Sequence, residues 1–408
     1  MLGAIIGDIV GSRFEFNSHK SKEFDLFGKD ELPQQNCHYT DDSIMTIATA
    51  DALFHAEDLS DEIALKKQII YQFHAYGKKY PWAGYGSNFF NWLYDNEVLP
   101  YGSYGNGSAM RVSPCGWFGD TLEECERLAE ISASVTHNHP EGIKGAVAVA
   151  GAIFLARTGK NKEDIRRYIE ERFYPHAFDK TLDEIRPDYT HIETCQDTVP
   201  QAFVAFYEST DFEDAIRCAV SLGGDCDTLT CIACSVAEAY YGIGGIPAII
   251  RENALSFLDE KMRDVLNNFQ RRYVIPRGNP ELLRHYESQK VRWEQAKKTY
   301  DLNISPIYII TTLENMERNK LGFLDTDDRR TVAFFHDLSE AQKAVEFNMG
   351  DINETIYDYA VIEKIGPGLY PHCINRWFYK YNYKDDAYEC IVEPDCISKN
   401  STFALSIG

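Results

Sequence analysis

Two patterns of hydrophobic and polar positions divide the chain near residue 300. Up to about residue 273, apolar residues recur three or four positions apart, as in helices with a buried face, and no segment predicts a convincing strand. Beyond residue 305 the segment 338–347 predicts a helix, and four runs rich in β-branched and aromatic residues predict strands: 307–313, 331–336, 358–365 and 377–383. The pattern therefore predicts a helical domain followed by a small α+β domain.

A basic amphipathic segment lies between the two parts. Among its arginines and lysines, apolar residues recur at helical spacing or multiples of it: Leu282, Leu283, Tyr286, Trp293 and Tyr300. The 408 residues exceed the size at which one core usually suffices. We predict a first domain over 1–275, a linker with an amphipathic helix over 276–304, and an accessory domain over 305–408. The accessory domain shows no catalytic constellation, so we expect it to bind a partner, self-associate or serve in targeting.

The chain begins with three glycines four positions apart, Gly3, Gly7 and Gly11, on one face of a predicted helix. Such a face lets a second helix approach closely, and this contact can outweigh a helix penalty of about 1 kcal/mol per glycine. Glu15 follows the predicted helix in a turn-like stretch. Taken alone, this stretch favours a solvated surface role for Glu15 over a functional one.

Two further segments predict helices of the first domain. Residues 61–80 carry apolar residues that we expect to face inward: Ile63, Ile69, Ile70 and Phe73. Residues 198–207 begin an apolar helix, and Pro200 is expected in its first turn, where proline is well tolerated.

Residues 221–241 predict a nearly all-apolar helix with a polar start. Gly223 and Gly224 permit a tight turn, and Asp225, Asp227 and Thr228 follow where the helix begins. A helix that is apolar on nearly every side is buried, so its polar tip is expected to open into an internal cleft. For this stretch alone, a simple acidic cap and a functional site are equally good interpretations.

A second apolar helix begins with the same chemistry. Thr40, Asp41 and Asp42 precede the apolar positions of 44–53. With Glu15 and the first cluster, they place five carboxylates where they can converge, and such charges repel unless they are protonated or joined by cations. Oxygen ligands without histidine or thiolate favour Mg²⁺, with Mn²⁺ or Ca²⁺ as alternatives. The helix dipole opposes a cation there, but at about 1 kcal/mol or less it is outweighed by several carboxylates.

Three other patterns are weak evidence for function. The glycine-rich segment 101–111 can turn its N–H groups toward an anion, but it is neither a Walker loop nor a Rossmann fingerprint, and a plain flexible loop is commoner. His137 and His139 have no partnering cysteine or histidine nearby, so hydrogen-bonding roles are favoured over metal binding. Cys231 and Cys234 form a CxxC without a second pair, and we predict that they pack in the core.

Composition narrows the classes of partner. A formal net charge of −22 and a pI near 4.9 disfavour a nonspecific grip on nucleic acid or anionic lipid. The longest apolar run, 145–156, is shorter than the roughly 20 residues that span a bilayer, and the apolar start is too short for a signal peptide. Eleven scattered cysteines suit reduced thiols better than disulfides. A cytoplasmic protein without a membrane partner is expected.

Taken together, several segments resemble the motifs of the ADP-ribosylglycohydrolase family, enzymes that remove ADP-ribose from modified acceptors. They are GAIIGDIVGS (3–12) followed by Glu15, YTDD (39–42), GSYGNGSAMRV (102–112), TH (136–137), TVP (198–200) and GGDCDT (223–228). Their order and spacing argue strongly against coincidence. The resemblance covers about residues 1–270 and implies an all-α orthogonal helical domain with a two-magnesium centre in a cleft. It does not reach the C-terminal domain.

The resemblance also implies roles for individual residues. Two Mg²⁺ ions, or Mn²⁺ in their place, would be ligated by Thr40, Asp41, Asp42, Asp225, Asp227 and Thr228. The catalytic carboxylates would be Glu15, Asp41, Asp225 and Asp227, with Glu15 as a further ligand or general acid/base. The diphosphate and ribose would be held by Gly102, Ser103, Tyr104, Gly105 and Asn106, with His137 nearby.

The expected reaction is magnesium-dependent hydrolysis of the N- or O-glycosidic bond between ADP-ribose and an acceptor, through an oxocarbenium-like state that carboxylates stabilise. Two other classes of function stay open: a non-catalytic ADP-ribose-binding or structural protein of this fold, and a metal-dependent nucleotide or phosphoester hydrolase. The intact set of proposed ligands favours an enzyme. The acidic surface favours a protein acceptor over nucleic acid, without distinguishing an arginine from a serine linkage.

Overall fold

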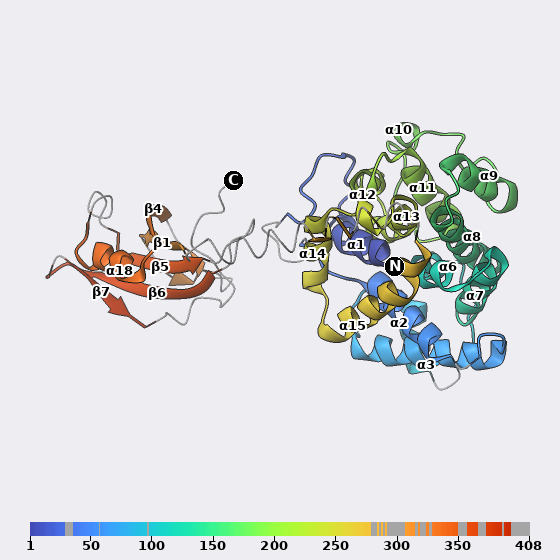
Figure 1. The fold of residues 1–408 in the computed structure, drawn as a ribbon, viewed down its shortest axis with the longest axis horizontal. Helices are drawn as coiled ribbons and strands as arrows, with labels where there is room; N and C mark the ends of the chain where they lie inside the picture. Colours follow the sequence, from blue (N-terminus) through green and yellow to red (C-terminus); the bar gives the residue numbers. More distant parts are fainter. Residues whose placement is uncertain are drawn as a thin grey trace. The chain divides into compact units, whose positions relative to one another are not determined.

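The chain divides into two compact units, residues 1–291 and 292–408 (Figure 1). The computed structural model describes all residues except 29–35, 57, 96–97, 279–283, 285–286, 289, 292–306, 315–316, 319–323, 326–328, 350–356, 366–372, 386 and 393–408. The described part of the first unit is helical, with one isolated β-bridge between Gly105 and Thr194. The second contains a small antiparallel sheet with one helix, so the predicted fold class is confirmed. Among the described residues, no helix combines the length and apolar character needed to cross a membrane.

Helices of different lengths make up the described part of the first unit. In chain order they are α1 Leu2–Gly11, α2 Asp41–His55, α3 Glu62–Lys79, α4 Ser87–Tyr94, α5 Gly107–Met110, α6 Ser113–Phe118, α7 Leu122–Ser134, α8 Pro140–Arg157, α9 Lys162–Arg172, α10 Leu182–Ile185, α11 Cys195–Glu208, α12 Phe212–Val220, α13 Cys226–Tyr241, α14 Ala248–Phe257, α15 Glu260–Phe269 and α16 Ile275–Arg277. A short 3₁₀ turn, η1 Ser12–Phe14, directly continues α1.

Helices α1 and α13 form the buried centre of this unit (Figure 1). A Cβ atom added to Gly3, Gly7 or Gly11 would lie 2.2–2.4 Å from a backbone carbonyl oxygen of α13. Those oxygens belong, in the same order, to Cys234, Thr230 and Cys226. The contacts advance along one helix while they retreat along the other, so the two helices run antiparallel with their backbones almost touching. The predicted glycine face is confirmed, and this contact brings the end of α1 beside the start of α13.

Two predictions about individual residues are wrong. Ile63 is 68% exposed rather than buried, because it lies two residues, or about 200° of helical turn, from Leu65, which shares the buried face of α3 with Ile69. Pro200 lies inside α11 rather than in its first turn, because the helix begins earlier, at Cys195. The backbone N–H of Cys195 donates to the Tyr104 carbonyl, so a tertiary contact sets this helix start.

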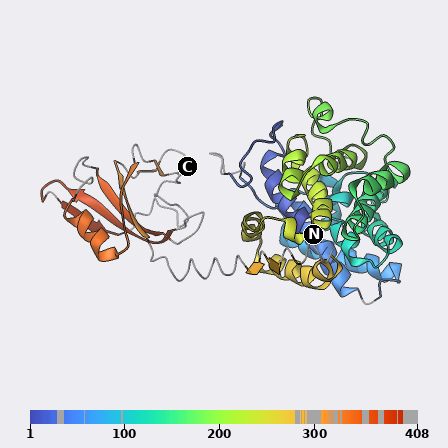
Figure 2. The same cartoon turned by 45° about the horizontal axis from the view of Figure 1, so that its top comes forward.

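The sheet of the second unit has five antiparallel strands in the order β4-β1-β5-β6-β7. Their bounds are β1 Ile307–Leu313, β4 Arg329–Phe335, β5 Tyr359–Ile365, β6 Cys373–Asn382 and β7 Ala387–Ile391; β2 Glu317–Arg318 and β3 Leu324–Asp325 form a separate pair. Helix α18, Leu338–Glu346, lies along one face of the sheet (Figure 2), where Ala341 and Val345 join a core with Ile310 and Ile362. The four predicted strands and the predicted helix are confirmed. The shorter strands β2, β3 and β7 were not predicted, because so few residues carry little pattern.

The predicted linker helix falls largely outside the described residues. None of the apolar positions on which it depends is described: Leu282, Leu283, Tyr286, Trp293 and Tyr300. This helix, the domain limits 1–275, 276–304 and 305–408, and the role of the accessory domain stay predictions.

Candidate active site

A buried carboxylate in α1, Asp8, holds the start of α2 in place. Its Oδ2 accepts hydrogen bonds from the N–H groups of Thr40 (3.0 Å) and Ser43 (3.1 Å) and from the Ser43 hydroxyl, and its Oδ1 accepts from the Thr40 hydroxyl at 2.7 Å. Burial raises the pKa of Asp8, and these hydrogen bonds oppose the rise. The N-terminus of α2, which carries Asp41 and Asp42, is therefore fixed against α1.

A glycine turn delivers the carboxylates of α13. Gly223 and Gly224 have φ angles of +69° and +81°, which favour glycine, so the predicted tight turn is confirmed. Asp225 then stands at the helix start, where the side-chain amide of Asn106 donates to its Oδ2 at 2.6 Å. Asp227 lies in the first helical turn and is 4% exposed. The turn thus buries two carboxylates side by side.

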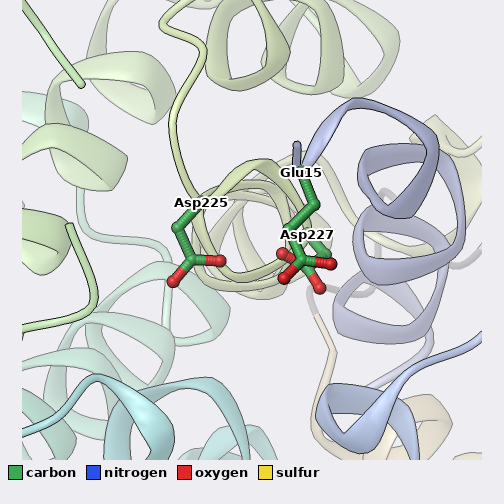
Figure 3. A group of neighbouring side chains, drawn as sticks. All are labelled: Glu15, Asp225 and Asp227. Atoms are coloured by element: carbon green, nitrogen blue, oxygen red, sulfur yellow. The ribbon is translucent and has the colours of Figure 1, made fainter. Parts of the chain in front are cut away.

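Side chains that lie far apart in the sequence converge at this point. Glu15, Asp225 and Asp227 each offer an oxygen atom, and these atoms lie within 4.8 Å of one another (Figure 3). Glu15 comes from the chain just after η1, whereas both aspartates come from the start of α13. The Thr228 hydroxyl joins α13 to α2 by donating to Asp42 Oδ2 at 3.3 Å. The two clusters recognised in the sequence therefore belong to one site.

Burial and mutual repulsion make these carboxylates hold protons strongly. Burial, followed by the neighbouring Asp227, raises the pKa of Glu15 to about 8, and burial raises the pKa of Asp225 to about 6. The pKa values of Asp41, Asp42 and Asp227 lie well above their ordinary range, again because of burial and nearby carboxylates. Removing these protons requires a compensating positive charge.

The donor set fits a divalent cation. Asp42 Oδ1 is buried and has no hydrogen-bond partner among the described residues, although a carboxylate oxygen in that position normally has one. The Thr40 hydroxyl donates its proton to Asp8 and accepts from the Asp42 N–H at 3.3 Å, which leaves one lone pair available to a cation. The predicted ligands Thr40, Asp41, Asp42, Asp225, Asp227 and Thr228 all offer hard oxygen atoms, as Mg²⁺ and similar ions prefer.

A cavity of about 350 Å³ lies beside the carboxylates. Glu15, Asp41, Asp42, Asp225, Asp227 and Thr228 line it, and so do four of the residues predicted to bind the ligand: Ser103, Gly105, Asn106 and His137. Gly102 and Tyr104 are not among the described residues that line this cavity. The N–H of Gly102 donates to Asn138 Oδ1 at 2.7 Å, and the Tyr104 ring, 48% exposed, packs 5.3 Å from the ring of His139.

The glycine-rich loop is anchored to the start of α11. The Asn106 N–H donates to the Glu193 carbonyl at 2.8 Å, and the Gly105 N–H donates to Ser103 Oγ at 3.1 Å. With the Gly102 N–H also engaged, three N–H groups of this loop are paired within the protein. The side-chain amide of Asn106 is engaged as well, since it donates to Asp225 Oδ2 at 2.6 Å and to Thr198 Oγ1 at 3.2 Å.

The predicted hydrogen bonding of His137 and His139 and the predicted burial of the CxxC pair are confirmed. His137 Nδ1 lies 2.8 Å from Thr136 Oγ1, and His139 caps α8 by accepting from the Glu141 N–H at 3.2 Å. Cys231 and Cys234 are free, buried thiols within α13. Neither pair belongs to the group formed by Glu15, Asp225 and Asp227.

Sequence reasoning missed two buried residues of the site. Asp8 carried a usable signal, since it is the single charged residue inside an otherwise apolar helix. Arg111 is 1% exposed and lines the cavity, yet only its place at the end of a glycine-rich segment drew attention to it.

Comparisons with known proteins agree with this architecture. The family model described as ADP-ribosylglycohydrolase matches residues 1–281. The chain is 26% identical to human "ADP-ribosylhydrolase ARH3" over 60% of this chain and 85% of that protein. It is also 26% identical to "ADP-ribosylarginine hydrolase Tri1" of Pseudomonas putida (strain GB-1), over 60% of this chain and 71% of that protein.

A solved structure shows the same fold. The structure titled "ADP-ribosylglycohydrolase-related protein complex" superposes with a TM-score of 0.52 and 23% identity, and the match covers 66% of this chain and 96% of that chain. The match between the family model and more than half of the sequence confirms the resemblance read from the motifs. The chain belongs to the ADP-ribosylglycohydrolase family of hydrolases.

Proposed function

We propose that this chain is a magnesium-dependent hydrolase that cleaves the glycosidic bond between ADP-ribose and a modified acceptor, with a protein side chain as the favoured acceptor. The observation that carries the proposal is the convergence of Glu15 with Asp225 and Asp227, beside Asp42, at a cavity of about 350 Å³. The names of the relatives, an ADP-ribosylhydrolase and an ADP-ribosylarginine hydrolase, support the same chemistry.

The proposed division of labour follows from the position of each side chain. The two ions would be held by Thr40, Asp41, Asp42, Asp225, Asp227 and Thr228. When bound, Mg²⁺ would neutralise the carboxylates and stabilise negative charge on oxygen atoms of the reactants. Asn106 would keep Asp225 oriented through the 2.6 Å hydrogen bond between them.

Glu15 is the preferred candidate for moving a proton. It lines the cavity, and one of its oxygen atoms lies within 4.8 Å of oxygen atoms of Asp225 and Asp227. In the proposed reaction its carboxylate takes a proton from the attacking water. The buried carboxylates beside it would stabilise positive charge that develops at the anomeric carbon.

The decisive experiment follows the products released from several substrates. Purified protein is incubated, with Mg²⁺ or with EDTA, with ADP-ribosylated arginine, serine and nucleic acid and with free ADP-ribose. Magnesium-dependent release of intact ADP-ribose supports the proposal. Release of AMP would instead identify a phosphoester hydrolase, and ADP-ribose binding without any release would identify a non-catalytic binding protein.

A matched pair of variants tests the role of Glu15. Glu15→Gln keeps the size of the side chain and removes its acid–base chemistry, and we expect a rate loss of about 100-fold or more. Glu123→Gln, at an exposed position of α7, is the control and should retain full activity. Release of ADP-ribose by Glu15→Gln at the wild-type rate would remove Glu15 from the mechanism.

A further inference from the structure

Two groups that line the cavity, a guanidinium and an imidazole, are joined by hydrogen bonds through a buried hydroxyl. Arg111 Nη2 donates to Thr136 Oγ1 at 2.8 Å, and Thr136 Oγ1 lies 2.8 Å from His137 Nδ1. All three residues are buried, and Arg111 and His137 both line the cavity. A charged side chain is therefore connected, through one hydroxyl, to an imidazole at the proposed ligand site.

The first link has only one direction. A guanidinium donates and never accepts, so Arg111 must donate to the oxygen of Thr136. Burial lowers the pKa of Arg111 to about 10, which leaves it charged at neutral pH. It is held by a second hydrogen bond to the Ser132 carbonyl at 3.2 Å and by the Phe73 ring, whose centroid lies 4.5 Å from the guanidinium carbon.

The imidazole at the other end is neutral at neutral pH. Burial, followed by the positive charge of Arg111, places the pKa of His137 well below its ordinary value. A neutral imidazole carries one N–H and one lone pair, and which ring nitrogen holds the proton depends on its surroundings. The tautomer of His137 is therefore set by what faces Nδ1 and what faces Nε2.

The surroundings of Nδ1 favour a lone pair there. Thr136 accepts from Arg111 and keeps a proton that it can donate to Nδ1, and the guanidinium charge on this side attracts a lone pair and repels an N–H. Burial raises the pKa of the neighbouring Tyr101 phenol to about 12, so it remains protonated at neutral pH and adds no negative charge on this side.

The other ring nitrogen faces the glycine-rich loop. A Cβ atom added to Gly107 would lie 3.2 Å from His137 Nε2, and one added to Gly105 would lie 3.6 Å from it. Both glycines line the cavity beside Ser103 and Asn106. A proton on Nε2 would consequently point toward the side of the cavity formed by this loop.

We propose that Arg111 and Thr136 are positioning residues that hold His137 as its Nε2–H tautomer, so that the imidazole presents a neutral hydrogen-bond donor to the diphosphate of bound ADP-ribose. The part that concerns the ligand rests on the proposed function, whereas the tautomer is a property of the protein alone. Arg111 acts through Thr136: its charge selects the lone pair on Nδ1, and His137 supplies the contact. The opposite tautomer would turn the lone pair of Nε2 toward an anion and would repel it.

The tautomer can be measured directly in the full-length protein. Two-bond ¹H–¹⁵N correlation spectra of ¹⁵N-histidine-labelled protein separate protonated from unprotonated ring nitrogens, and the signals of His137 are those that disappear in His137→Gln. We expect a protonated Nε2 and an unprotonated Nδ1 near neutral pH in protein without ligand. A protonated Nδ1, or a doubly protonated ring, would overturn the proposal whatever the protein hydrolyses.

Two substitutions at Thr136 separate positioning from packing. Thr136→Val keeps the volume and removes the hydroxyl, and Thr136→Ser keeps the hydroxyl and removes a methyl group. We expect Thr136→Val to weaken ADP-ribose binding about tenfold, the size of one hydrogen bond to a charged group, and to change the His137 spectrum. Thr136→Ser should restore both the spectrum and the affinity, with the expected loss appearing in Kd and KM more than in kcat.

Each result has a defined meaning. If folded Thr136→Val keeps the wild-type affinity and spectrum, Thr136 does not position His137 and the proposal is overturned. Equal losses of affinity in the valine and serine variants would also overturn it, because they would indicate that Thr136 acts through packing. If Thr136→Val fails to fold, the proposal is still tested by the tautomer in the wild-type spectrum and by the affinity and spectrum of Thr136→Ser. A wild-type protein with the Nε2–H tautomer that neither binds nor releases ADP-ribose would refute the proposed function while leaving the tautomer in place.

Discussion

The two sides of the cavity order their polar groups in different ways. On the carboxylate side, buried acids repel one another, and Asp42 Oδ1 has no hydrogen-bond partner among the described residues. On the wall beside it, Arg111, Thr136 and His137 are connected by two hydrogen bonds of 2.8 Å. The carboxylate side therefore offers oxygen ligands to a cation, whereas the protein itself orders the wall. This difference predicts that metal removal and wall substitutions will have separable effects.

The largest effect is expected from a change in the contact between α1 and α13, which positions the carboxylates. Gly7→Val places side-chain atoms where a Cβ alone would lie 2.3 Å from the Thr230 carbonyl oxygen, so α1 must move away from α13. We expect a loss of about 3 kcal/mol or more in the free energy of unfolding, measured by denaturant titration. Gly86→Val is the control, because a Cβ at Gly86 meets no atom within 4 Å. Equal stability of the two variants would contradict the close helix contact.

The next largest effect is expected from a substitution on the carboxylate side, which should reduce hydrolysis more than ADP-ribose binding. Asp227→Ala removes a central carboxylate, and we expect magnesium-dependent hydrolysis to fall about 100-fold or more, while ADP-ribose binding is reduced less because the wall is intact. Rates and Kd values are compared with those of Asp183→Ala, whose side chain is 85% exposed. If Asp41→Ala and Asp227→Ala both keep full magnesium-dependent activity, the metal assignment is wrong.

A smaller effect is expected from the carboxylate that sequence reasoning missed. Asp8→Asn keeps the shape of the side chain but replaces an acceptor oxygen with a donor, which disturbs the hydrogen bonds to Thr40 and Ser43. We expect magnesium affinity to fall about 10- to 100-fold, as for other residues that orient metal ligands, and excess Mg²⁺ to recover much of the rate. The measurement is activity against Mg²⁺ concentration, and an unchanged half-saturation point would rule out the orienting role of Asp8.

The smallest effect concerns stability as a function of pH. Without metal, the folded protein holds protons that the unfolded chain releases, since the pKa values of Asp225 and Glu15 are raised to about 6 and about 8. Their stabilising contribution is present at low pH and is lost as the pH rises through those values. Melting temperatures in EDTA should therefore fall between about pH 5 and about pH 8.5 by more than in excess Mg²⁺. If the melting temperature falls equally with pH in EDTA and in Mg²⁺, the cation does not compensate the charge of these carboxylates. The effect of the overall negative charge on the melting temperature is the same in both conditions and cancels in the comparison.

Local patterns predicted much of this site because helix starts and glycine faces depend on neighbouring residues. Thr40, Asp41 and Asp42 in one segment, and Asp225 and Asp227 in the other, were recognised as polar tips of apolar helices. The glycine face of α1 predicted the close approach of another helix, and α13 occupies that face. Glu15 alone indicated only a surface residue, and it gained significance from the two clusters and the family motifs.

The sequence by itself thus determined the helical first domain, the sheet-containing second unit, the two acidic helix starts and the family, because periodicity, capping and motif order are properties of the chain. Only the tertiary structure decided that Asp8 binds the start of α2, that Gly102 and Tyr104 lie off the cavity wall, and that Arg111 reaches His137 through Thr136. These facts depend on which side chains face one another after distant helices pack. That packing is a sum of many long-range contacts, and no local spacing records it.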